Sequence, residues 1–171
     1  MNKKRGNILL QINIGFLLVC LVIVTFYQSF LEAFFNMRKI EEDLEVNRVH
    51  RLLISNIEQK ITYQARQVCL VDNGYGTTLS CQQLGGKRLV EFYCRPNGQN
   101  DKVQGLYIST ETLGAEAGVN PLTAPNLQVH KFQAEALDTT SFMLTLELGM
   151  VDSTRKHTFT EVFNLCNGII V

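Results

Sequence analysis

The hydrophobic pattern changes twice along the chain, and its first part is uniformly apolar. Gly6 to Leu31 contains no charged residue, and Ile14 to Val24 contains no polar side chain. A helix crosses the hydrocarbon core of a bilayer with roughly 20 apolar residues. The first pattern therefore predicts a membrane-spanning helix.

The second pattern is amphipathic and follows without a break. Charged residues alternate with apolar residues three to five positions apart, as on one face of a helix. The chain has no glycine between Gly15 and Gly74, and its first proline is Pro96. We therefore expect one helix from about Ile8 to about Arg66, roughly 90 Å long. The apolar positions of its amphipathic half are Ile40, Leu44, Val49, Leu53, Ile57 and Ile61.

The third pattern, from residue 68 to the end, favours β-structure. Short segments rich in β-branched and aromatic residues are bounded by turn residues, as in Asp72–Gly76 and Pro96–Asp101. Gly85–Arg88 also has the composition of a hairpin turn. Residues 111–126 form an expected surface loop, either a variable contact surface or a simple connector. The expected strands cover 68–71, 89–93, 106–108, 127–132, 142–148 and 157–163.

These patterns predict an α+β fold, with a long N-terminal transmembrane-plus-stalk helix packed on a C-terminal antiparallel sheet. Lys3, Lys4 and Arg5 precede the apolar run, so the N-terminus is expected in the cytoplasm and the remainder outside the membrane. Residues 30–33 offer bulk and charge where a signal peptidase requires small residues. We therefore expect an uncleaved single-pass anchor unless another enzyme processes it.

Composition and motifs give no sign of catalysis. Lys and Arg together number 16, as do Asp and Glu, so the chain lacks the basic excess that nucleic-acid binding requires. The sequence lacks a phosphate-binding loop, a GxSxG motif and an HExxH motif. Residues 41–45 carry four acidic side chains, expected to face solvent or a basic residue of a neighbouring subunit. The prediction is a protein that is not an enzyme and has no cofactor or metal.

The cysteines suggest disulfides in the outer domain. Cys20 lies in the apolar run and is expected to be inert. Cys69 and Cys81 each lie six residues from Tyr75, so strands pairing about that turn would bring them face to face. Cys94 and Cys166 would then form a second bond. Free thiols in all four positions are the alternative, while the spacing disfavours zinc.

A family resemblance rests on the leader and the layout. Lys3-Lys4-Arg5-Gly6, a helix apolar in its first half and amphipathic in its second, and a C-terminal sheet resemble type IV pilins and pseudopilins. The resemblance implies cleavage by a prepilin peptidase between Gly6 and Asn7, methylation of Asn7, and packing of the helices in a filament core. It implies a leader at 1–6, a membrane and filament helix at 7–31, a stalk helix at 32–67 and an extracytoplasmic β domain at 68–171.

The fifth residue after the expected cleavage site indicates which kind of pilin subunit the resemblance implies. In the family it is usually Glu, which neutralises the N-terminal ammonium of an adjacent subunit, and this chain has Gln11. Asn7 likewise departs from the usual Phe or Met. The resemblance therefore implies a minor subunit of a pilus, type II secretion or competence filament, at a tip or in an initiation complex.

The layout is similar to J-type pseudopilins, PilW-like minor pilins and ComGF-like competence pseudopilins. Its partners would be other pilin subunits, the prepilin peptidase and the membrane, and its location a cell-surface or periplasmic filament after assembly. Two alternatives stay open. One is an uncleaved envelope scaffold that binds a partner through its stalk helix, and the other is an extracytoplasmic ligand-binding domain.

Overall fold

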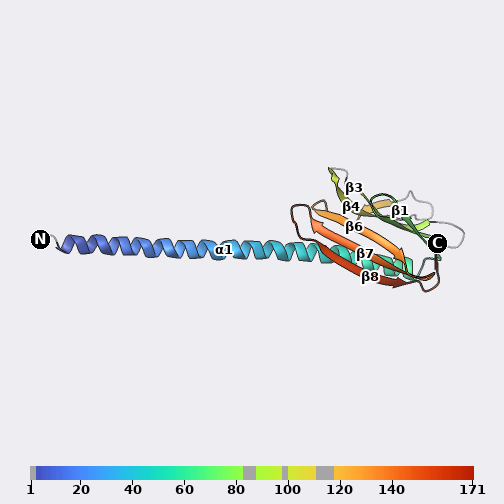
Figure 1. Cartoon of the computed structure of the whole chain (residues 1–171), viewed down its shortest axis with the longest axis horizontal. Helices are drawn as coiled ribbons and strands as arrows, with labels where there is room; N and C mark the ends of the chain where they lie inside the picture. Colours follow the sequence, from blue (N-terminus) through green and yellow to red (C-terminus); the bar gives the residue numbers. More distant parts are fainter. Residues whose placement is uncertain (1–2, 83–87, 98–99, 111–117) are drawn as a thin grey trace. The chain divides into compact units, whose positions relative to one another are not determined.

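The computed structural model describes residues 3–82, 88–97, 100–110 and 118–171. Helix α1 (Lys3–Ile57) continues into a π-helical turn, η1 (Glu58–Thr62), so the single long helix expected from the sequence is confirmed. The chain divides into two compact units, residues 1–43 and 44–171. The first unit consists of helix, and the second contains the end of α1 and all the strands (Figure 1).

The second unit contains two sheets, whereas the sequence predicted one. The larger sheet has six strands in the order β5-β4-β3-β2-β1-β9, and the smaller has three in the order β6-β7-β8. Neighbouring strands are antiparallel except β1 and β9, which are parallel. The strands are β1 (Gln67–Asp72), β2 (Thr77–Gln82), β3 (Arg88–Asn97), β4 (Asn100–Thr110), β5 (Gly118–Pro121), β6 (Leu127–Ala136), β7 (Ser141–Met150), β8 (His157–Asn164) and β9 (Ile169–Ile170).

The expected segments correspond to the structure only in part. The expected loop at 111–126 contains strand β5 at the edge of the larger sheet, while residues 111–117 lie outside the described part of the chain. The expected strand at 157–163 corresponds to β8, and the sequence did not predict the short strand β9 that follows it. The expected turns at 85–88 and 96–101 also lie partly outside the described residues.

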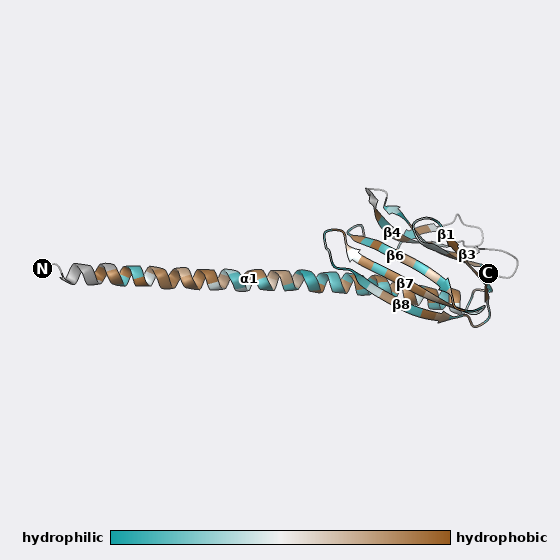
Figure 2. Cartoon of the chain, in the orientation of Figure 1, coloured by the Kyte–Doolittle hydropathy of each residue, from teal (hydrophilic) through white to brown (hydrophobic). Residues whose placement is uncertain are grey.

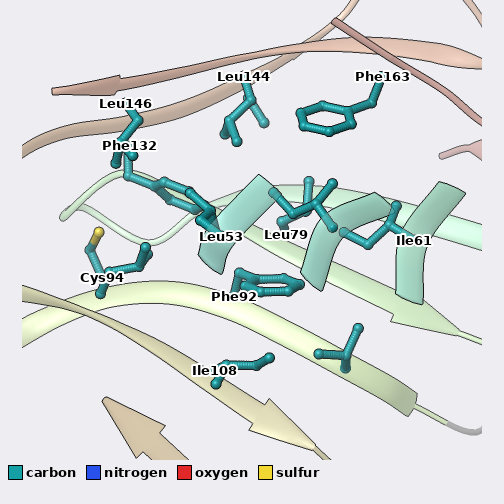
Figure 3. Close-up of a cluster of buried hydrophobic side chains, with 14 of the residues drawn as sticks. Leu53, Ile61, Leu79, Phe92, Cys94, Ile108, Phe132, Leu144, Leu146 and Phe163 are labelled. Atoms are coloured by element: carbon teal, nitrogen blue, oxygen red, sulfur yellow. The ribbon is translucent and has the colours of Figure 1, made fainter. Parts of the chain in front are cut away.

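One face of the end of the helix forms the centre of the core. Val46, Val49, Leu53, Ile57 and Ile61 are each 1% exposed or less. Figure 3 shows Leu53 and Ile61 between side chains of the two sheets, with Phe92 and Ile108 on one side and Leu144 and Phe163 on the other. Burial of such aliphatic and aromatic groups contributes about 1.5–3 kcal/mol for each side chain. The helix end therefore stabilises both sheets.

The π-helical turn fits the spacing of the buried residues. Ile57, Ile61 and Ala65 are four residues apart and all are buried. A spacing of four exceeds the α-helical repeat of about 3.6 residues, and the wider π-turn keeps the three side chains on one side. The chain then leaves the helix as Arg66 N donates to Gln82 O at 3.0 Å, next to strand β1.

The expected apolar stripe was only partly correct. Ile40 and Leu44 were predicted on the same buried face as Val49 and Leu53, yet they are 58% and 65% exposed. The buried stripe begins instead at Val46. In an α-helix, residues 40 and 44 lie on nearly the opposite side from residues 46, 49 and 53, because each residue turns the helix by about 100°.

Candidate functional site

The uncharged segment of α1 is the clearest functional feature, because the sequence makes it apolar on every side. Its large side chains from Leu10 to Phe30 are more than half exposed, from 52% at Ile14 to 77% at Phe26. Figure 2 shows the corresponding brown stretch of α1. Within the described residues, one helix is long and apolar enough to span a membrane. A single membrane-spanning helix near the N-terminus is thus supported by both length and composition.

The hydroxyl groups of Thr25 and Ser29 in this segment are satisfied within the helix. The Thr25 hydroxyl donates to the Val22 carbonyl oxygen at 2.9 Å, and the Ser29 hydroxyl donates to the Thr25 carbonyl oxygen at 3.0 Å. Polar groups in hydrocarbon need internal partners, since no water is present there. These bonds make the two residues compatible with the bilayer.

The residues expected to be processed lie at the beginning of the same helix. Gly6 and Asn7 have helical backbone, and Gln11 is an exposed helical residue one to two turns further along. The amide of Gln11 can exchange hydrogen bonds with a neighbouring chain, but it carries no charge to neutralise an ammonium group. Gly6, Asn7 and Gln11 thus lie within the first three turns of α1, and their roles in processing and register stay predictions.

The predicted Cys69–Cys81 pair is wrong by one register position. The two strands do form a hairpin about the Asp72–Gly76 turn, but Cys69 lies opposite Ser80 and Cys81 opposite Val68. Adjacent cross-strand pairs point to opposite faces of a sheet. Cys81 consequently points into the core, where it is fully buried, and Cys69 points to the other face.

The predicted Cys94–Cys166 bond is also absent. Cys94 is buried in β3 and Cys166 is exposed after β8, and all five cysteines of the chain are free thiols. Burial raises the pKa of Cys81 and Cys94 to about 12 each. These two thiols are therefore un-ionised and unreactive at neutral pH.

A largely apolar hollow with a volume of about 590 Å³ lies beside Val171. Leu70, Leu137 and Val171 contribute to its lining together with Asp138. The Asp138 carboxylate accepts hydrogen bonds from the Ser141 hydroxyl at 2.5 Å and from the backbone N–H and the hydroxyl of Thr140 at 2.6 and 2.9 Å, which hold its pKa at about 2. This carboxylate thus shapes the β6–β7 turn rather than serving as an acid or base.

A second, more polar hollow of about 340 Å³ lies between the Asp72–Gly76 turn and strand β6. Its carboxylate, Asp72, accepts a hydrogen bond from Gly74 N at 2.9 Å and is part of the turn. His130 also contributes to the lining, and burial lowers the pKa of its imidazole. Within the described residues, no group of three or more His, Cys, Asp or Glu side chains is placed to hold a metal ion.

The acidic segment at 41–45 does not form the uniformly solvated face that the sequence suggested. Glu42 is only 7% exposed. Arg48 Nη1 lies 3.3 Å from Glu45 Oε1 one helical turn away in the same chain. The sequence offered Arg48 or Arg51 of a neighbouring subunit as one possible partner of these acids, and it did not predict this local pair, which the spacing of three residues favours.

Comparison with known proteins returned nothing. No protein-family model, no curated protein and no solved structure matches this chain. The apolar helix and the domain to which it is joined are therefore the features that indicate function.

Proposed function

We propose that this chain is a minor pilin or pseudopilin subunit of an envelope-spanning filament, acting in assembly initiation or at the filament tip. The observation that carries the proposal is the continuity of α1, which is apolar and exposed around Leu10–Phe30 and is buried in the core of the β domain from Val46 onward. The same helix thus combines a segment for membrane or helix-bundle packing with a folded domain for lateral contacts.

The proposed mechanism is assembly rather than catalysis. In the membrane form, lipid covers the apolar segment at Ile14–Val24. During filament assembly, apolar side chains of neighbouring helices replace the lipid, and the β domain contacts sister subunits. The prepilin peptidase would cut between Gly6 and Asn7 before this step.

Gln11 supports a minor rather than a major subunit. An ammonium group at Asn7 buried in a filament core requires a nearby anion, since an unpaired buried charge is costly. A neutral amide at position 11 provides none, so repeated stacking of this subunit is unfavourable. Gln11→Glu should therefore change assembly while leaving the stability of the β domain unchanged.

Processing can be tested by expressing the full chain in membranes with and without a prepilin peptidase. We expect the peptidase to remove residues 1–6 from the wild-type chain and to leave Gly6→Leu at full length. Gly15→Ala is the matched control, because the added methyl meets nothing within 4 Å. Cleavage of Gly6→Leu at the same site, or no cleavage of the wild type beside a processed prepilin, would contradict the proposal.

A further inference from the structure

The stretch of α1 that begins at the end of the uncharged run carries an apolar stripe that the domain core does not use. Phe30, Met37, Ile40 and Leu44 are 67%, 61%, 58% and 65% exposed, and Ala33 is exposed between them. Their spacing is alternately three and four residues, which is the spacing of a helix–helix seam. We call these five residues the juxtamembrane stripe.

This stripe is separate from the buried face of the same helix. The buried stripe begins at Val46, two residues after Leu44, and continues through Val49 and Leu53. The juxtamembrane stripe and the buried stripe do not belong to one heptad repeat, because they lie on different sides of α1. Arg38 and Lys39 stand between Met37 and Ile40, so lipid alone does not account for these two apolar residues.

The membrane limits what can cover this stripe. Another helix inserted with the same orientation runs parallel to α1, and an identical chain presents the same stripe at the same depth. When two parallel helices pack along such a stripe, a residue beside the stripe on one helix faces the residue numbered five higher on the partner helix. Asp43 and Arg48 have this separation and opposite charges, and Arg48, whose Nη1 lies 3.3 Å from Glu45 Oε1 of its own chain, has further N–H groups for a partner's carboxylate. One heptad earlier, Asn36 would face Glu41 of the partner helix, and these two residues do not carry like charges.

We propose that a second copy of this chain covers the juxtamembrane stripe, in a parallel helix pair held in register by the membrane and by Asp43–Arg48 contacts between the two copies. Each copy loses about half of the exposed apolar surface of Met37, Ile40 and Leu44 to its partner, which favours association. This pairing does not depend on cleavage after Gly6. It applies to the membrane form of the chain whether or not the chain later enters a filament.

Photo-crosslinking of the full chain in membranes tests the contact. Two copies with different affinity tags are co-expressed, each with a photoreactive amino acid at Ile40 or, as the control, at Lys39 on the adjacent side of the helix. We expect a product that carries both tags from position 40 and at most a trace from position 39. Equal yields at both positions, no mixed-tag product, or crosslinking only to another protein would overturn the proposal.

A charge exchange tests the register. With the photoreactive group at Ile40, Asp43→Arg or Arg48→Asp alone should reduce the mixed-tag yield about threefold, since each leaves like charges facing. The double variant restores the opposite charges and should return the yield to that of the parent chain. A double variant that stays as low as either single variant would overturn the assigned register. Circular dichroism of each variant checks that the β domain remains folded, and its N-terminal mass in the same sample reports processing separately.

Discussion

His50 of α1 stacks on Phe159 of β8, with ring centroids 4.0 Å apart and an interplanar angle of 13°. His50 Nε2 also lies 3.6 Å from Glu161 Oε1. Burial lowers the pKa of His50, with a smaller lowering effect from Arg51, while Glu161 opposes both. Within this contact the folded state therefore favours the neutral imidazole of His50.

This contact predicts acid sensitivity of the β domain. Because the folded state lowers the pKa of His50 below its ordinary value of 6.5, the unfolded chain binds the proton more readily. Stability is thus complete above about pH 7.5 and decreases as the pH falls toward 5. His50→Phe keeps an aromatic ring against Phe159 and removes the titration.

Urea unfolding of the full chain in detergent at pH 7.5 and pH 5 measures the effect. The wild type should lose more stability between these pH values than His50→Phe does. His130, whose pKa is also lowered by burial, supplies a remaining part of the slope in both proteins. An identical loss in the two proteins would show that His50 is not a source of the acid sensitivity.

Two adjacent leucines test which face of α1 enters the core. Leu53 is fully buried and Leu52 is 42% exposed. Leu53→Ala should lower the free energy of unfolding by about 3–4 kcal/mol, because it leaves a cavity between the two sheets. Leu52→Ala should cost less than about 1 kcal/mol. Chemical denaturation of both variants gives the comparison, and equal costs would contradict the observed orientation of the helix.

The sequence predicted the helix better than the face on which it packs. The absence of breakers between Gly15 and Gly74 was sufficient for one continuous helix. Ile40 and Leu44 were misassigned because apolar residues occupy two opposite sides of the helix there, and periodicity alone does not say which side meets a sheet. The residues on the exposed side are those of the juxtamembrane stripe.

The two glycines of the β1–β2 turn should respond differently to substitution. Gly76 has φ +141°, and a Cβ there would clash with the Phe132 carbonyl oxygen. Gly76→Ala should therefore destabilise the domain by about 2–3 kcal/mol, since backbone must move as well as adopt a strained conformation. Gly74 has φ +82° and open space around it, so Gly74→Ala should cost about 1 kcal/mol.

Thermal unfolding of these two variants, compared with the wild type, measures the difference. We expect the larger loss of stability for Gly76→Ala, because residue 76 packs against β6. We expect the smaller loss for Gly74→Ala, because residue 74 requires only a left-handed backbone. A Gly74→Ala variant less stable than Gly76→Ala would contradict the packing of this turn on β6.

The free thiols predict how the protein responds to reduction and to alkylation. Reduction should leave the thermal midpoint unchanged, because the structure contains no disulfide among the five cysteines of the chain. Under native conditions, alkylation should modify exposed Cys166 and spare Cys81 and Cys94, whose pKa values of about 12 leave little thiolate. Mass spectrometry before and after denaturation counts the modified sites. A shift of the midpoint on reduction would restore the disulfide hypothesis.

The β domain was harder to predict than the helix. Most expected strands overlap real ones, but their division between two sheets depends on contacts far apart in the sequence, such as Ile170 N donating to Thr139 O at 2.8 Å. The Cys69–Cys81 hypothesis identified the hairpin but not its register, and a shift of one residue reverses the faces of a strand. Gly6, Asn7 and Gln11 were identified from the leader pattern, because their role would depend on chemistry and not on the fold.

The central claim is that this chain is a processed subunit of a pilin-like filament. The most direct test is the N-terminal sequence and intact mass of the protein isolated from membranes of its native host. The account predicts a chain that begins at Asn7 and carries one added methyl group. A chain that still begins at Met1, in cells that process other prepilins, would contradict the account and leave an anchored envelope scaffold as the explanation.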